Sequence, residues 1–65
     1  MSEKARLNIA AICKALRKQN KWSEQELADK AGVGRSAIRD IEHATGNPTL
    51  DTLDKVGNAL GVDLY

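Results

Sequence analysis

The sequence has very little of what disulfides, metal sites and most enzyme active sites need. It contains one cysteine, Cys13, one histidine, His43, and one proline, and its only aromatic residues are Trp22 and Tyr65. A single cysteine cannot form an internal disulfide, which is typical of a cytoplasmic protein. The acidic residues form no paired acid–base pattern, and the sequence has no glycine-rich phosphate loop. We therefore expect no catalytic residue, no metal, no cofactor and no small-molecule substrate, with Cys13 in the core and His43 solvated or capping a helix.

Long hydrophobic runs are missing as well. No apolar stretch is long enough to cross a bilayer, and the N-terminus lacks a signal-peptide pattern, so we expect no membrane association. Hydrophobic residues make up 42% and charged residues 29% of the chain, a balance typical of a globular protein. At 65 residues, the chain is expected to form a single domain over residues 1–65. Because aromatics are so few, its core must be aliphatic, which suits packed helices.

Charge is nearly balanced overall but unevenly distributed. The net charge is +1. Residues 1–21 carry six basic residues and one acidic residue, whereas residues 22–65 carry four basic and eight acidic ones. This asymmetry permits one basic and one acidic face. Charge alone fits a nucleic-acid-binding face and ordinary solvated lysines equally well.

The most informative segment is QELADKAGVGRSAIRDIEH, residues 25–43. Its small and apolar residues form two short stripes at helical spacing, first Leu27, Ala28 and Ala31 and then Ile38 and Ile41. Gly32 separates them, since glycine enters a left-handed conformation without steric cost. The pattern predicts two short helices joined by a sharp turn, a helix-turn-helix over about 24–43. The second helix of such a unit can project into the major groove of DNA.

Capping residues set the limits of these two helices. Ser23 and Glu26 have capping-box spacing, with Trp22 placed to act as a hydrophobic staple, so we predict a helix over 24–31. Gly34 is expected to cap a second helix running from Arg35 to residue 43 or 44.

Two further helices are predicted around this unit. After a polar, frayed N-terminus, residues 7–20 have a core stripe made of Ile9, Ile12, Cys13 and Leu16. Thr49 is expected to cap a last helix that Gly61 ends. The buried stripe of that helix is Leu50, Leu53, Val56 and Leu60. Gly57 within it suggests close packing against a neighbouring helix. These elements predict an all-α fold, a compact bundle of four to five short helices.

At this point the residues resemble a known family. The run SEQELADKAGVGRSAIRDIE (23–42), with LR at 16–17, NPTLDTL at 47–53 and ALGV at 59–62, is similar to the Cro/C1-type helix-turn-helix domain of phage repressors and bacterial regulators. The resemblance covers about residues 7–62. It implies a lambda repressor-like fold and a sequence-specific transcriptional regulator, either a repressor or a phage-type control protein. Such a domain would bind double-stranded operator DNA through the major groove, as a homodimer on a near-palindromic site.

The resemblance also implies which residues meet DNA. The helix that begins after Gly34 would be the recognition helix. Its base-contacting positions would be Gly34, Arg35, Ser36, Arg39 and Asp40. Phosphate contacts would come from the start of the preceding helix and from the following loop. Those positions are Arg17, Lys21, Ser23, Glu24, Gln25, Thr45, Asn47 and Thr49. Arg17 and Glu42 match two family positions that form a structural ion pair between the first and third helices.

Three positions depart from the family pattern. Glu24 stands where glutamine is usual, and its carboxylate opposes a phosphate. Ala44 and Lys21 replace common glycines, and we expect Asn20 to take the left-handed conformation in place of Lys21. A second functional hypothesis stays open: an antitoxin-like or coactivator-like protein-interaction module on the same fold. It would need an exposed apolar patch on helix 50–60 and the tail, which are also candidates for the dimer surface.

Overall fold

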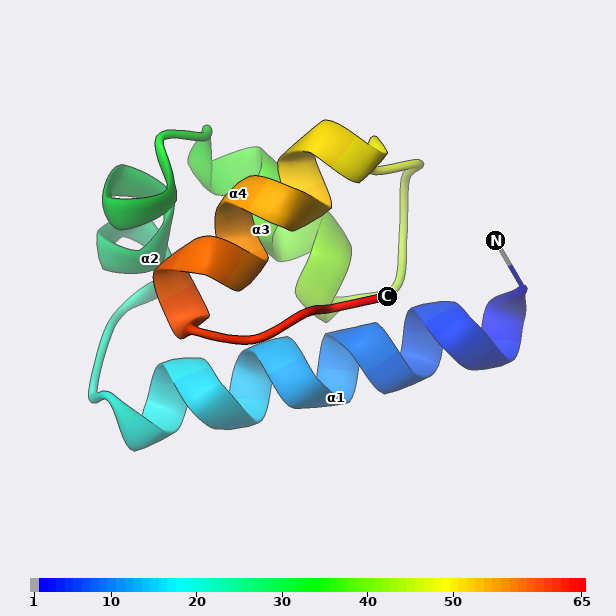
Figure 1. The fold of residues 1–65 in the computed structure, drawn as a ribbon, viewed down its shortest axis with the longest axis horizontal. Helices are drawn as coiled ribbons and strands as arrows, with labels where there is room; N and C mark the ends of the chain where they lie inside the picture. The colour runs from blue at the N-terminus through cyan, green and yellow to red at the C-terminus, as the bar shows by residue number, and fades with distance from the viewer. Residues whose placement is uncertain (1) are drawn as a thin grey trace.

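The computed structural model describes residues 2–65, which form four α-helices and no strand. Their bounds are α1 (Glu3–Gln19), α2 (Glu24–Ala31), α3 (Arg35–Glu42) and α4 (Leu50–Leu60). Helix α1 runs along one side of the molecule, α3 and α4 pack on it, and α2 packs on α3 and α4 (Figure 1). The C-terminal tail passes between α4 and α1. This is the all-α bundle that the sequence predicts.

The N-terminus differs from the expected frayed segment. Helix α1 begins at Glu3, four residues before the predicted start, and Ser2 caps it by accepting a hydrogen bond from the Ala5 amide at 3.1 Å. Apolar periodicity starts only at Leu7, so it could not reveal this turn. A serine at the cap and a glutamate in the first turn stabilise the added residues without apolar burial.

Helices α2 and α3 have nearly the predicted bounds. The capping box forms, with Ser23 Oγ accepting from the Glu26 amide at 3.0 Å and Glu26 Oε1 accepting from the Ser23 amide at 2.9 Å. Gly32 takes the left-handed conformation, with φ of 73°. Gly34 is the N-cap of α3, which ends at Glu42, one or two residues before the predicted end. The sharp turn between the two helices is therefore fixed by local sequence.

Two connections contain non-glycine residues in the left-handed region. Lys21 has φ of 60° and Ala44 has φ of 54°. The expectation for Asn20 is wrong, because Asn20 has φ of −83° and its side chain donates to the Leu16 carbonyl at 2.8 Å. This bond holds Asn20 on the end of α1, so the chain reverses one residue later. A β-carbon in this region costs roughly 1–2 kcal/mol.

The core is aliphatic and draws on all four helices. Its fully buried side chains are Cys13, Leu27, Ala28, Ile38, Leu53 and Val56. Two stripe residues were predicted wrongly: Ile12 is 42% exposed and Leu50 is 59% exposed. Leu50 is the first residue of α4, and Ile12 lies beside the strip of α1 that packs on α3 and α4. Half-buried Trp22 packs on the core, as its staple position predicts.

The tail completes the core beside α4. Leu64 is 4% exposed and joins the core cluster. Gly57 makes this possible, since a β-carbon there would lie 2.5 Å from the Val62 carbonyl oxygen. The close neighbour of Gly57 is thus the returning tail, and the prediction of a neighbouring helix is wrong.

Candidate nucleic-acid interface

Helix α3 presents a polar face to solvent and an apolar face to the core. Ile38 is fully buried and Ile41 is 3% exposed, and these two side chains anchor the helix. All five residues predicted to contact bases lie on the exposed side: Gly34, Arg35, Ser36, Arg39 and Asp40. Ala37, expected to face inward, is half-buried. The orientation of α3 is therefore set by two isoleucines one turn apart.

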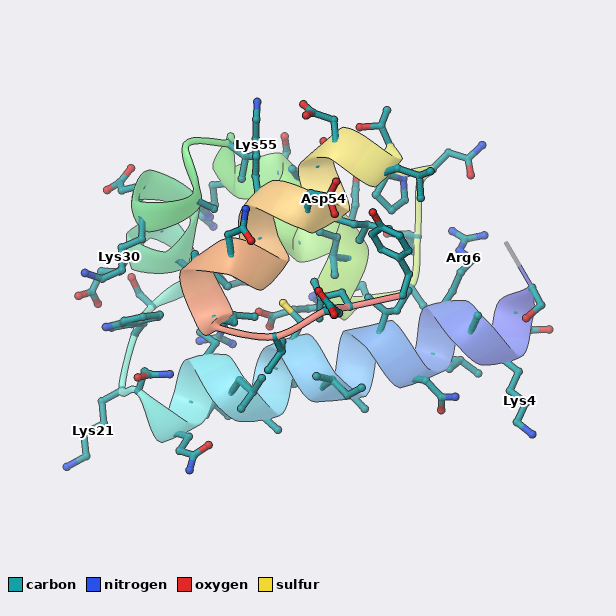
Figure 2. All side chains as sticks on the ribbon, viewed as in Figure 1. Lys4, Arg6, Lys21, Lys30, Asp54 and Lys55 are labelled. Carbon is teal, nitrogen blue, oxygen red and sulfur yellow. The ribbon has the colours of Figure 1, made fainter. Side chains whose placement is uncertain are left out.

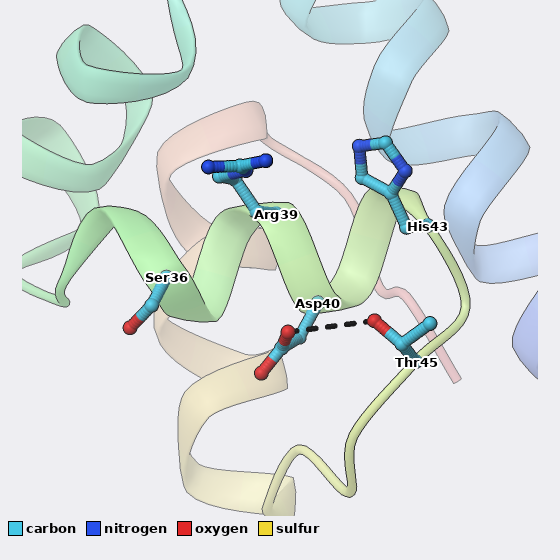
Figure 3. A pocket seen from close by; sticks show the side chains of 5 residues that line it. All are labelled: Ser36, Arg39, Asp40, His43 and Thr45. Atoms are coloured by element: carbon cyan, nitrogen blue, oxygen red, sulfur yellow. Dashed lines mark hydrogen bonds between the residues drawn. The ribbon is translucent and has the colours of Figure 1, made fainter.

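A shallow hollow of about 350 Å³ lies on this exposed face and the loop that follows it. Figure 3 shows its lining residues, Ser36, Arg39, Asp40, His43 and Thr45. His43 is the C-cap of α3 and is exposed. It was not among the predicted site residues, although it lies four residues after Arg39 and so falls on the same helical face.

Asp40 is held by the loop after α3. Its Oδ1 accepts a hydrogen bond from Thr45 Oγ1 at 3.4 Å, and its carbonyl accepts from the Thr45 amide at 2.9 Å (Figure 3). The carboxylate also packs over Gly46, where a β-carbon would lie 2.8 Å from Oδ2. Asp40 thus shapes the loop, while its side chain stays on the exposed face.

The residues predicted to contact phosphate fall into two groups. Lys21, Ser23, Glu24 and Gln25 lie before and in the first turn of α2, and Figure 2 shows Lys21 pointing away from the protein. Ser23 Oγ is used by the capping box, Gln25 Nε2 donates to Asp29 Oδ1 at 2.9 Å, and Glu24 is half-buried.

The second group lies in the connection from α3 to α4. Thr45 and Asn47 are exposed there, and Thr49 caps α4 by accepting from the Thr52 amide at 3.1 Å. The two groups lie toward opposite ends of the molecule in the view of Figure 1, with α3 between them. The two groups therefore flank α3 on either side (Figure 1).

Arg17 joins α1 to the buried face of α3. Its Nε donates to Glu42 Oε2 at 2.7 Å and its Nη2 donates to Glu42 Oε1 at 2.9 Å. Nη1 donates to the Trp22 carbonyl at 2.9 Å. The hydrogen bond with Glu42 raises the pKa of Arg17 above its usual value. A phosphate contact by Arg17 would have to use the hydrogens that these bonds leave.

Cys13 lies against the same carboxylate, with its Sγ 3.8 Å from Glu42 Oε2. Burial first, and then the negative charge of Glu42, raise the pKa of the Cys13 thiol to about 12. The thiol is therefore protonated and unreactive at neutral pH, as expected for a core residue. Within residues 2–65, no cluster of three or more potential ligand side chains is placed to hold a metal ion. The same residues include no helix that is both long and apolar enough to cross a membrane.

Comparison with known proteins places this geometry among helix-turn-helix domains. A family model described as Helix-turn-helix matches residues 14–65. The immunity repressor protein of Bacillus phage phi105 is 45% identical over 58 residues, which are 89% of this chain and 40% of the repressor. Antitoxin HipB of Escherichia coli K12 is 34% identical over 56 residues, 86% of this chain and 64% of the antitoxin. The chain thus spans less than two thirds of these relatives.

A solved structure agrees with the sequence matches. The crystal structure of the hypothetical transcription factor NHTF from Neisseria superposes with a TM-score of 0.84 at 31% sequence identity. The superposition covers 98% of this chain and 73% of that one.

Proposed function

Because the chain belongs to the Cro/C1-type helix-turn-helix family, a family of DNA-binding regulators and not of enzymes, we propose that it is a sequence-specific transcriptional regulator acting on double-stranded operator DNA. The observation that carries the proposal is helix α3. It is anchored through Ile38 and Ile41 while Arg35, Ser36 and Arg39 face solvent. A helix fixed in this way can enter a major groove without unfolding any part of the core.

Base recognition would come from the first two turns of α3. Arg35 is the first residue of the helix and can donate a bidentate pair to guanine O6 and N7, worth about 1–3 kcal/mol of discrimination. Ser36 can donate or accept, and Arg39 can reach a base or a phosphate. Asp40 can accept from cytosine N4, with Thr45 fixing the direction of its carboxylate. Gly34 lets the backbone approach the groove closely.

Phosphate contacts would fix the position of α3 in the groove. At one edge, the amides at the start of α2 and the side chain of Lys21 favour an anion. At the other edge, Thr45 and Asn47 are exposed donors. Glu24 weakens the first edge, so one copy of the domain is expected to bind modestly.

Dimerisation would supply the rest of the affinity. A domain of this size covers one half-site, so we propose a homodimer on a near-palindromic operator in the cytoplasm. The proposed contact surface is α4 with the tail, where Val62 is 36% and Tyr65 is 62% exposed. We further propose that the protein acts as a repressor or a phage-type control protein. The phage relative is itself named an immunity repressor.

A second candidate function is a protein-interaction module. The similarity to antitoxin HipB favours it, as do the exposed apolar side chains of Leu50, Val62 and Tyr65 on α4 and the tail. In that case the arginines of α3 would be dispensable, and the partner would cover α4 and the tail.

Selection of bound sites from a pool of random duplexes, followed by a salt titration, separates the two functions. A regulator yields a two-fold-related motif and an association constant that falls steeply with salt. The spacing of the half-sites would also report the geometry of the dimer. Absence of saturable binding at low salt would refute the proposed regulator.

A further inference from the structure

The first turn of α1 lies against the loop that joins α3 to α4. Arg6 projects from α1 toward this loop, whereas Lys4 projects from the other side of the helix (Figure 2). Nη2 of Arg6 donates a hydrogen bond to the Gly46 carbonyl, forty residues away in the sequence. Gly46 is also the residue over which Asp40 packs. The loop is thus held from α1 on one side and from α3 on the other.

A second hollow, about 440 Å³, lies between this first turn and the end of α3. Its lining residues are Glu3, Arg6, Leu7, His43 and Ala44. His43 also lines the hollow on the exposed face of α3. The two hollows are therefore neighbours that share one side chain, and the polar surface of α3 continues past its C-terminal end onto α1.

Arg6 and His43 can hold an anion in this second hollow. A guanidinium has five N–H donors, and the bond to Gly46 uses one of those on Arg6. The hydrogen bond to the loop also limits the freedom of the Arg6 side chain, so less entropy is lost when a further partner binds. His43 is exposed and can donate from its imidazole ring in either protonation state. Glu3 is the one acidic residue lining the hollow, and its carboxylate opposes an anion.

We propose that Arg6 and His43 bind a backbone phosphate of the DNA that flanks the half-site, outside the bases read by α3. The inference rests on the proposed function, because it takes Thr45 and Asn47 as phosphate contacts. A strand that passes these exposed residues continues over the adjoining hollow. The site extends the DNA contact from the helix-turn-helix onto the first turn of α1, which none of the predicted contacts includes.

The test uses two duplexes: the selected half-site with mixed-sequence flanks, and the same half-site trimmed of those flanks. Arg6→Gln and His43→Gln should each weaken binding to the flanked duplex. Arg6→Gln removes a positive charge, so it should also make the salt dependence shallower by about one unit of log K per log salt. Binding to the trimmed duplex should be unchanged. Lys4→Gln is the matched control, since it removes the same charge from the same turn of α1 but projects away from the loop.

A variant that is expected to strengthen binding separates the loss of a phosphate contact from damage to the loop that Arg6 holds. Glu3→Gln removes the opposing carboxylate and should strengthen binding to the flanked duplex alone. The proposal would be overturned if Arg6→Gln and Lys4→Gln weakened binding to the flanked duplex equally. It would also be overturned if Arg6→Gln weakened binding to both duplexes equally while His43→Gln had no effect. In those cases the wild-type chain still selects a motif, so only this inference fails. If no motif is selected at all, the proposed function fails first.

Discussion

Arg17 on α1 and Glu42 on α3 form a bidentate ion pair at the centre of the fold, with 1% of the Glu42 side chain exposed. The pair connects the long helix to the helix that carries the proposed reading surface. It also supplies the opposite charge for a carboxylate that would otherwise be buried with only the Cys13 thiol against it.

Removing one member of this pair should destabilise the domain strongly. Arg17→Met leaves the Glu42 carboxylate buried and unpaired, so the free energy of unfolding should fall by about 3–5 kcal/mol in a urea titration. The double variant Arg17→Met/Glu42→Leu should recover part of this loss, because it buries no charge. A loss below about 1 kcal/mol for the single variant would mean that water reaches Glu42 in solution.

Glycine should stabilise the two strained connections. Ala44→Gly relieves a left-handed φ of 54°, and Lys21→Gly relieves one of 60°, so each should raise the free energy of unfolding by up to about 1 kcal/mol. The control is Asn20→Gly, whose φ is already negative; it should destabilise the protein. Equal destabilisation by all three glycines would show that these backbone angles are not kept in solution.

Gly57→Ala should destabilise the protein despite the better helix propensity of alanine. The propensity gain is about 1 kcal/mol, but the new β-carbon would lie 2.5 Å from the Val62 carbonyl and displace the tail that buries Leu64. We expect a lower melting temperature than for Asn58→Ala, an exposed position on the same helix. A stabilised Gly57→Ala variant would mean that the tail does not pack here.

Arg35→Ala and Lys21→Ala should differ in the kind of DNA binding they affect. Loss of Arg35 should relax preference at one base pair of each half-site, at a cost of about 1–3 kcal/mol on the preferred sequence. Loss of Lys21 should weaken binding to all sequences alike and reduce the salt slope. Site selection with each variant measures both effects, and an unchanged motif for Arg35→Ala would refute the assignment of the recognition helix.

The raised pKa of Cys13 predicts a loss of stability at alkaline pH. The folded protein keeps the thiol protonated up to a pKa of about 12, whereas the unfolded chain ionises near the ordinary value of 9.0. Its contribution to stability is therefore complete below pH 9 and declines from there toward pH 12. Comparing urea midpoints of wild type and Cys13→Ala across this range isolates the effect. Parallel curves for the two proteins would contradict it.

The sequence was sufficient to predict the elements whose ends are set by local chemistry. Helices α2 and α4 begin and end where they were expected, because caps act within a few residues. Their N-caps are Ser23 and Thr49, and their C-caps are Gly32 and Gly61. The start of α1 was missed because its first turn is stabilised by a cap and polar residues and has no apolar stripe.

Long-range features were the ones that the sequence could not supply. The exposure of Ile12 and Leu50 depends on where neighbouring helices stop, and the hydrogen bond from Arg6 to Gly46 joins distant segments. The spacing of Asp40 and Thr45 gave no sign that their side chains meet across the end of α3. For the candidate site, the exposed face of α3 followed from Ile38 and Ile41, but the hollow that His43 lines together with the first turn of α1 required the folded structure.

The reversal of the chain after α4 has a practical consequence for anyone who attaches a label or a second protein. The backbone turns at Gly61 and runs back between α4 and α1, so a fusion after Tyr65 would emerge beside the middle of α1 and not from the end of α4 (Figure 1). A rigid linker there would displace Leu64 from the core, whereas a flexible spacer would leave Leu64 buried. The linker, more than the attached protein, would decide whether such a fusion folds.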